Sequence, residues 1–278
     1  MRFEKWQALG NDYLVLERSE LPFELDAARV RSICAPHFGC HSDGILLLSP
    51  SDDPDHVAEL RIFNPDGSEA GLSGNGARQA ALYLRSAGWT DETEFTILTP
   101  AGEVHPTITG PGTASMDLGR ARTTSDDFPS GAVDGLGRLT AAGREWSFRH
   151  VAVGNPQCAI EVAADELESL DLDSIGPEIE ESDLFPNRTN VSFWSSSGRT
   201  VRARIFERGV GQTLSSGTGA AGAAVAAHLE GAESPITVRL DGGELAVELG
   251  PELELRLSGS AEPVFAGEFS PEFVRSLE

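Results

Sequence analysis

The chain is poor in lysine. Lys5 is its only lysine, and it precedes every glycine-rich turn, in a segment that we expect to form an edge strand. Enzymes that use pyridoxal phosphate hold this cofactor as a Schiff base on a lysine side chain. The sequence therefore argues against pyridoxal phosphate, and we expect a protein that works without a cofactor.

Cysteine and long apolar runs are also scarce. The three cysteines, Cys34, Cys40 and Cys158, cannot all pair and indicate no disulfide framework. No run approaches the roughly 18 to 20 apolar residues of a membrane span. The first residues, MRFEKWQALGNDY, lack the basic-then-apolar pattern of a secretory signal. We therefore expect a cytoplasmic protein that does not bind a membrane.

Positive charge is the third deficit. Lysine and arginine together number 21 against 44 acidic residues, which gives a formal net charge of −23. Because the phosphates of a nucleic acid require a basic face, we expect no nucleic-acid partner. The acidic residues are scattered rather than gathered in one tail, a pattern typical of solubility or adaptation to salt.

The 278 residues are enough for two domains, each with its own core. Short alternating apolar runs, separated by turn-like segments, predict mostly antiparallel strands. Two alanine-rich stretches, 77–85 and 220–229, predict helices of about three turns, and 29–33 and 271–277 predict shorter ones. The expected fold class is α+β, with two pseudo-symmetric domains, each a mainly antiparallel sheet wrapped around a central helix.

The two domains share a motif that recurs at a constant offset in residue number. One copy, FNPDGSEAGLSGNGARQAALYL, begins at Phe63, and the other, FERGVGQTLSSGTGAAGAAVAAHL, begins at Phe206. Each copy is also preceded by a Gly-Asn pair, which ends at Asn11 before the first copy and at Asn155 before the second. We infer a duplication, with an N-terminal half of residues 1–118 completed by 260–278, and a C-terminal half of residues 119–259. A ligand between the halves would meet matching groups from opposite sides.

Each copy of the motif has a serine and two glycines where its helix begins. The turns are Ser73-Gly-Asn-Gly-Ala and Ser216-Gly-Thr-Gly-Ala. Serine is a preferred N-cap and glycine permits a tight turn, so capping alone would account for one copy. A helix N-terminus also offers unpaired N–H groups and a positive dipole potential to a carboxylate. Two such turns would hold an amino-acid carboxylate and make its α-proton more acidic.

Polar side chains near these turns complete a candidate binding site for a small amino acid. They are four asparagines and one acidic–basic pair: Asn11, Asn64, Asn155, Asn190, Glu207 and Arg208. Each asparagine alone is typical of a turn, and the Glu-Arg pair alone could be a surface ion pair. Together they suit a zwitterion, since arginine binds a carboxylate and glutamate binds an ammonium group.

Six strings resemble the diaminopimelate epimerase family, in order and over nearly the whole chain: LGNDY (9–13), SDGILLL (42–48), FNPDGSEAGLSGNGAR (63–78), GNPQCAI (154–160), FPNRTNVSF (185–193) and FERGVGQTLSSGTGA (206–220). The resemblance implies a pyridoxal-independent epimerase with two pseudo-symmetric halves. It implies two-base proton transfer at Cα between LL- and meso-diaminopimelate, for lysine and peptidoglycan synthesis. The resemblance is also compatible with a homodimer.

The resemblance also implies roles for individual residues. The six polar residues named above would touch the substrate, and the backbone at Gly74, Asn75, Gly217 and Thr218 would grip the reacting carboxylate. The family's two catalytic bases are cysteines, and this chain has Ser73 and Ser216 in their places. A histidine that is usual in the family after the second Gly-Asn-Pro is Gln157.

Serine is a much weaker acid than cysteine. A free thiol has a pKa of about 8.5 and an alcohol one near that of water, about 15.7, a gap that costs about 10 kcal/mol. A helix dipole contributes only about 0.3–2 kcal/mol. Three interpretations stay open: a serine pair aided by a third group, proton abstraction from another amino acid by an isomerase or lyase, or an amino-acid-binding homologue with little or no turnover.

A metal site is a further alternative. Cys34, His37, Cys40 and His41 place four potential ligands within eight residues. Their spacing matches no standard zinc finger, and Pro36 restricts how the loop could fold around an ion. We expect a half-buried loop with incidental thiols and no metal.

Overall fold

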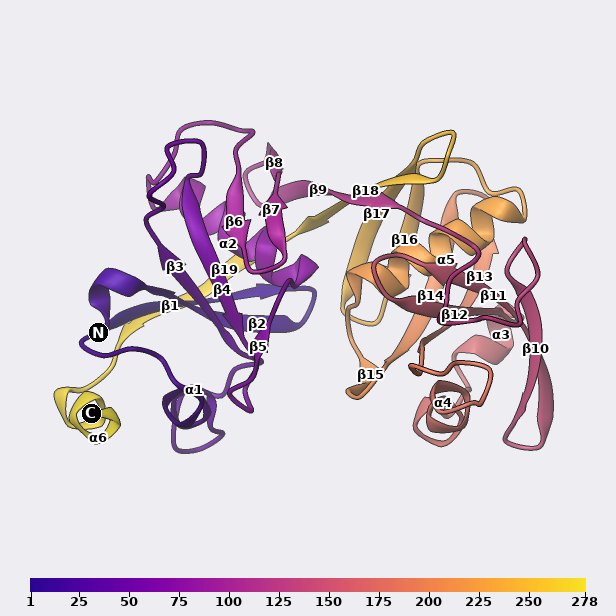
Figure 1. Ribbon diagram of the computed structural model, residues 1–278, viewed down its shortest axis with the longest axis horizontal. Coiled ribbons are helices and arrows are strands. Elements are labelled where there is room, and N and C mark those ends of the chain that lie inside the picture. The colour runs from indigo at the N-terminus through magenta and orange to yellow at the C-terminus, as the bar shows by residue number, and fades with distance from the viewer. The chain divides into compact units, whose positions relative to one another are not determined.

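The computed structural model describes all 278 residues, and the chain forms two compact units. Unit 1 consists of Met1–Met116 and Gly259–Glu278, and unit 2 consists of Asp117–Ser258. The yellow C-terminal segment thus returns to the indigo N-terminal sheet, where β19 (Glu262–Glu268) lies beside β1 (Arg2–Ala8) (Figure 1). No helix is long and apolar enough to cross a membrane.

The sheet of unit 1 has the strand order β19-β1-β2-β3-β4-β6-β7, with β5 paired to β4. Its remaining strands are β2 (Asn11–Glu17), β3 (Ile45–Ser49), β4 (Ala58–Phe63), β5 (Glu69–Ala70), β6 (Ile97–Thr99) and β7 (Gly102–Val104). The pairs β1–β2, β3–β4 and β6–β7 are antiparallel, whereas β2–β3 and β4–β6 are parallel. The strands β8 (Thr107–Gly110) and β9 (Thr113–Arg120) pair as an antiparallel hairpin, which stands at the end of the second sheet in the order β18-β9-β8.

Unit 2 repeats this arrangement. Its strands are β10 (Leu136–Ala141), β11 (Arg144–Ala152), β12 (Pro156–Glu161), β13 (Asn190–Ser197), β14 (Thr200–Glu207), β15 (Gly211–Thr213), β16 (Ile236–Leu240), β17 (Gly243–Leu249) and β18 (Glu254–Ser260). The pairs β11–β12, β13–β14 and β16–β17 are antiparallel, and β12–β13 and β14–β16 are parallel. The sequence of pairings is the same as from β1 to β7.

The register of the strands repeats as well. Phe63 of β4 lies opposite Ile45 of β3, and Phe206 of β14, which the motif aligns with Phe63, lies opposite Val191 of β13. In unit 1 β4 ends at this phenylalanine, and in unit 2 β14 ends one residue after it. In both units a short strand, β5 or β15, follows and leads into the glycine-rich turn. The predicted fold class, two pseudo-symmetric α+β halves, is therefore confirmed.

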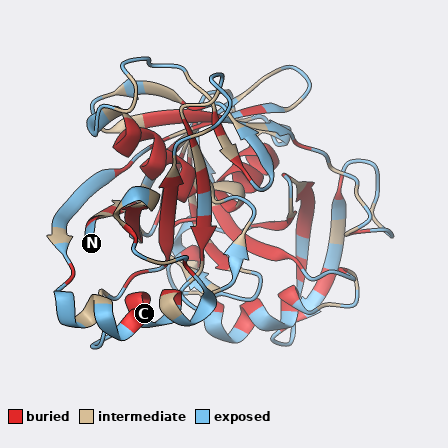
Figure 2. Ribbon diagram, turned by 60° about the vertical axis from the view of Figure 1, so that its left-hand side comes forward, coloured by how far each residue is buried: buried red, intermediate tan, exposed pale blue.

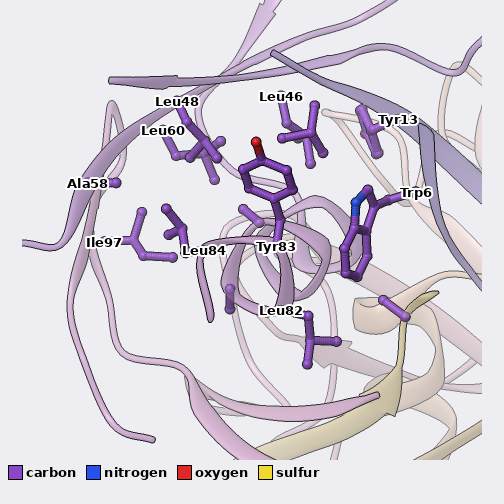
Figure 3. Packing of buried hydrophobic residues seen from close by; sticks show 14 of the residues in the cluster. Trp6, Tyr13, Leu46, Leu48, Ala58, Leu60, Leu82, Tyr83, Leu84 and Ile97 are labelled. Carbon is purple, nitrogen blue, oxygen red and sulfur yellow. The ribbon is translucent and has the colours of Figure 1, made fainter. Parts of the chain in front are cut away.

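Each unit has one long helix packed against its sheet. In unit 1, α2 (Gly74–Ser86) packs against β1, β2 and β3. The Tyr83 ring of α2 lies edge-on to Trp6, with ring centroids 6.2 Å apart, among leucines that include Leu46 and Leu84 (Figure 3). Burial of these large side chains supplies most of the driving force for this packing.

In unit 2 the corresponding helix is α5 (Gly217–Leu229), which contacts β11, β12, β13, β14, β16 and β17. All its positions from Gly219 to Ala227 are buried. Most of these residues are alanine, with a single methyl group, or glycine, with no side chain, so the strands can approach this helix closely from several sides. Buried residues, in red, are concentrated in strands and helices, whereas the loops are mostly exposed (Figure 2).

The sequence predicted some of the shorter helices and missed others. The structure has α1 (Ala27–Cys34) and α6 (Pro271–Leu277) where short helices were predicted. Unit 2 also contains α3 (Ala164–Leu167) and α4 (Leu172–Glu180), which the sequence did not indicate, and a 3₁₀ turn at Arg18–Glu20 lies in unit 1.

Candidate active site

The two serines of the repeated motif occupy the same structural position. The Oγ atom of Ser73 accepts the Gly76 N–H at 3.1 Å, and the Oγ atom of Ser216 accepts the Gly219 N–H at 3.2 Å. Their backbone angles also match, with φ −134° and ψ 121° at Ser73 and φ −139° and ψ 118° at Ser216. Each serine is an N-cap, and its hydroxyl is held above the first turn of a helix.

The first turns of α2 and α5 present backbone donors. The first N–H groups of a helix have no acceptor within it. In these helices they belong to Gly74 and Asn75 of α2 and to Gly217 and Thr218 of α5. A Cβ added at Gly74 would meet nothing within 4 Å, so a ligand can approach this backbone closely. Both turns have the chemistry of an anion-binding site.

In unit 1 a phenol accompanies the serine. The Tyr13 hydroxyl donates to the Oγ atom of Ser73 across 3.4 Å. The Tyr13 ring occupies space that Gly44 leaves free, since a Cβ at Gly44 would lie 2.8 Å from the ring. Ser73 is half-buried, and two donors, Tyr13 and the backbone of Gly76, point at its oxygen. Such an arrangement favours negative charge on that oxygen.

The unit 1 asparagines are held in three different ways. Asn11 donates through Nδ2 to a carboxylate oxygen of Asp43 at 2.9 Å. Asn64 donates through Nδ2 to the Ser68 hydroxyl at 2.9 Å, inside the turn between β4 and β5. The third, Asn75, lies in the first turn of α2 and is buried. Asn64 therefore has the turn contacts typical of its residue type, in addition to any role in binding.

In unit 2 the serine has a carboxylate partner. The Ser216 hydroxyl donates to the carboxylate of Glu207, which is half-buried. Burial raises the pKa of Glu207 above its ordinary value of 4.5, and the hydrogen bond from Ser216 partly offsets this. A carboxyl group with a raised pKa, bonded to a hydroxyl, has the chemistry to act as a general base for that hydroxyl.

The side chain of Asn190, at the start of β13, bonds to the backbone of Arg208, which directly follows β14. The side-chain oxygen of Asn190, which is buried, accepts the Arg208 backbone N–H at 2.8 Å. The Arg208 guanidinium is exposed and donates to the Asn187 carbonyl at 2.7 Å. No salt bridge joins Arg208 to Glu207, so the two are separate charged groups at this site rather than a surface ion pair.

Sequence reasoning named Gln157 only as a departure from the family, but the structure gives it a contact with the site. Gln157 is fully buried and donates through Nε2 to the side-chain oxygen of Asn155 at 2.7 Å. Asn155 in turn donates through Nδ2 to the Thr218 hydroxyl at 3.2 Å. The position of Gln157, two residues after Asn155 in a strand, was the signal available in the sequence.

The structure brings together six of the predicted residues in unit 2, in three contacts: Glu207 with Ser216, Asn155 with Thr218, and Asn190 with Arg208. In unit 1, Ser73, Gly74 and Asn75 are consecutive. Asn11 reaches α2 through its carbonyl, which accepts from Gln79 at 3.0 Å. The side chain of Asn64 bonds within its own turn, to Ser68.

The cysteines do not have the features of reactive thiolates. Burial raises the pKa of Cys34 to about 12 and that of Cys158 well above its ordinary value. No group of three or more histidine, cysteine, aspartate or glutamate side chains has the arrangement of a metal site. His37 and His41 lie in left-handed turns, with φ of 69° and 48°.

Solved structures named as an epimerase and a racemase share the fold of this chain. A predicted epimerase from Pseudomonas aeruginosa matches with a TM-score of 0.70 and 19% identity, covering 96% of this chain and 98% of that one. A probable proline racemase from Agrobacterium radiobacter matches with a TM-score of 0.69 and 15% identity, covering 98% and 95%. The fold is that of the two-unit epimerases and racemases.

Sequence relatives identify the family within this class. The family model described as diaminopimelate epimerase matches residues 3–124 and 149–262. The chain is 38% identical to diaminopimelate epimerase 2 of Nostoc sp., over 98% of this chain and 96% of the relative. It is 37% identical to the diaminopimelate epimerase of Desulfitobacterium hafniense, over 96% and 97%. The chain belongs to the diaminopimelate epimerase family.

Proposed function

We propose that the protein interconverts LL- and meso-diaminopimelate by proton transfer at Cα, without pyridoxal phosphate, and so serves lysine biosynthesis. The observation that carries the proposal is the matched pair of serine-capped helix starts at the positions of the family's two bases. Family membership over nearly the whole chain supports the substrate. The two catalytic residues in this proposal are Ser73 and Ser216.

The substrate is held as a zwitterion. Its reacting carboxylate accepts from the backbone at Gly74 and Asn75 of α2 and at Gly217 and Thr218 of α5. Negative charge develops on this carboxylate when the α-proton leaves, and the two helix N-termini stabilise that charge. The remaining contacts come from four asparagines and the charged pair: Asn11, Asn64, Asn155, Asn190, Glu207 and Arg208.

The protons balance over one turnover. One serine oxygen takes the α-proton from one face of Cα, and the other serine gives its own proton to the opposite face. After turnover the first serine carries a proton and the second has lost one, and the enzyme returns to its starting state when these protons exchange with water. The donors around Ser73 lower the cost of forming an alkoxide there, which is large for serine, whereas Glu207 is placed to accept the Ser216 proton when that serine acts as the base.

A second candidate is an amino-acid-binding homologue with little turnover. The observation that favours it is the presence of two alcohols where the chemistry is easier with two thiols, a difference of about 10 kcal/mol in deprotonation. Such a protein would use the same helix starts for its ligand and would leave the α-hydrogen in place.

The deciding experiment is exchange of the α-hydrogen in heavy water. Purified protein is incubated with LL-diaminopimelate in D₂O, and the products are followed by proton NMR and chiral chromatography. We expect one deuterium at Cα together with the meso isomer. Calorimetric binding without deuterium incorporation over hours, at high protein concentration, would support the binding homologue. If a different amino acid from a small panel exchanged its α-hydrogen and LL-diaminopimelate did not, that amino acid would be the substrate.

A further inference from the structure

We propose that Arg78 is a positioning residue for the α2 helix start: its buried, unneutralised guanidinium holds the side chain of Asn75 and favours the deprotonated form of the group at position 73. The consequence for catalysis rests on the proposed function. The electrostatic effect itself does not, because it can be measured without substrate.

The guanidinium of Arg78 is buried with few partners. Its side chain is 0% exposed. One Nη atom donates to the side-chain oxygen of Asn75 at 2.6 Å, and the other lies 3.4 Å from the Gly74 carbonyl. The Nε atom has no hydrogen-bond partner. Burial lowers the pKa of Arg78 to about 10, so the side chain remains charged at neutral pH.

No carboxylate neutralises this charge. The helix α2 packs against β1, β2 and β3, and β3 has no ionisable side chain. The charged groups of β1 and β2 bond elsewhere: Arg2 to Glu20, Glu4 to Trp6, Lys5 to Asp12, and Glu17 to Tyr83 and Trp89. The nearby Asp43 accepts from Asn11.

An isolated buried cation is unfavourable for folding, and an apolar side chain of similar volume would fill the same space without that cost. Arg78 therefore needs a reason other than packing. It lies one turn into α2, where the helix dipole is already positive, and its only charge-assisted hydrogen bond goes to a residue of the proposed carboxylate-binding turn. Both effects stabilise negative charge at the start of this helix.

The repeat supplies a comparison within the same chain. The motif aligns Arg78 with Ala221 and aligns Glu207 with Asn64. The α2 start thus has a cation without an anion beside it, whereas the α5 start has a carboxylate bonded to Ser216 and no buried arginine. This difference assigns the deprotonated form to position 73 and the protonated form to Ser216.

The experiment uses an introduced thiol as a pH reporter. Ser73→Cys and Ser216→Cys are made separately, each with Arg78 and with Arg78→Met, and each thiol pKa is measured by ultraviolet absorbance of the thiolate and by alkylation rate. Burial raises the pKa of the native thiols Cys34, Cys40 and Cys158, so they titrate above the reporter.

At position 73 we expect a thiol pKa below that of a free cysteine, as is usual at helix starts near arginine. Arg78→Met should raise it by about one unit, a tenfold loss of thiolate at neutral pH. At position 216 the same substitution should change little. An unchanged pKa at position 73, or an equal shift at both positions, would overturn the proposal.

Controls separate charge from packing. Arg149→Met removes another buried arginine, one that pairs with Glu230, and should leave the thiol at position 73 unaltered. Arg78→Lys keeps the charge and should preserve most of the low pKa. If Arg78→Met does not fold, Arg78→Gln gives the neutral comparison, with the same expected rise. Wild-type protein that exchanges no α-hydrogen would refute the proposed function, while the reporter result would still decide the role of Arg78.

Discussion

Gln157 of β12 packs directly against Gly222 of α5: a Cβ atom at Gly222 would lie 2.9 Å from both Cβ and Cγ of Gln157. The motif aligns Gly222 with Gln79 of α2. Gln79 is also fully buried, and it donates to the carbonyl of Asn11, as Gln157 donates to the side chain of Asn155. Each unit therefore buries one glutamine amide beside its Gly-Asn turn, from the helix in unit 1 and from the strand in unit 2.

The first prediction concerns this glutamine. Gln157→Leu keeps the volume but removes the donor that orients Asn155, so we expect the KM for LL-diaminopimelate to rise about tenfold, the effect of one lost hydrogen bond to the binding site. Steady-state kinetics and calorimetry measure it. Gln212→Leu, at an exposed glutamine, is the control and should leave KM unchanged. An unaltered KM in Gln157→Leu would show that Asn155 is held by other contacts.

The second prediction separates capping from catalysis. Ser73→Ala and Ser216→Ala should each cost about 0.5–2 kcal/mol of unfolding free energy, because each removes an N-cap, and each should abolish α-hydrogen exchange. Ser270 caps α6 through the Phe273 N–H at 3.2 Å, so Ser270→Ala should lose similar stability and retain exchange. Denaturant titration and the D₂O assay measure both quantities. Full exchange in both site variants would exclude these serines as bases.

The third prediction restores the thiols. The double substitution Ser73→Cys with Ser216→Cys lowers the intrinsic pKa of both bases by about 7 units, so we expect epimerisation to accelerate at least about a hundredfold. Initial rates with LL-diaminopimelate, at matched protein concentration, give the comparison. A rate no higher than that of the natural chain would mean that the substrate is another amino acid.

The fourth prediction follows from Glu207. Because its folded-state pKa is raised, the folded protein retains this proton where the unfolded chain has released it. Its contribution to stability is thus present below pH 4.5 and is lost as the pH rises through the folded-state pKa. Glu207→Gln should remove this dependence and make the protein more stable than wild type at neutral pH.

The same variant tests the role of the carboxylate in catalysis. An amide cannot accept the Ser216 proton, so exchange should fall by about a hundredfold or more, the usual contribution of a general base. Unfolding curves between pH 4 and 8, together with exchange rates, provide the two readouts. A variant that is less stable at neutral pH would contradict the raised pKa.

Local patterns were sufficient for much of the fold. The alternating runs, the two alanine-rich helices and the aligned motifs predicted two related α+β halves. The helices begin at Gly74 and Gly217, a few residues before the predicted starts, since glycine has low helix propensity but is accepted in a first turn. The missed helix α4 contains Pro177, and its Gly176 allows contact with Phe206, which local patterns do not reveal.

The side-chain contacts of the site were harder to predict. The serine caps follow from local sequence. The bond from Tyr13 to Ser73, however, joins β2 to the start of α2, and the bond from Gln157 to Asn155 joins β12 to the turn before it. Such contacts depend on strand register and on where small residues such as Gly44 leave room. The lack of a carboxylate beside Arg78 depends on how charged residues of several elements pair with one another, which no local sequence pattern contains.

The return of the C-terminal segment to unit 1 has a consequence for synthesis on the ribosome. Unit 2 is one continuous stretch, whereas β1 gains its outer neighbour only through β19, residues 262–268. We therefore expect the half translated first to be completed only after the other half, with the free edge of β1 unprotected until residues 262–268 have been translated.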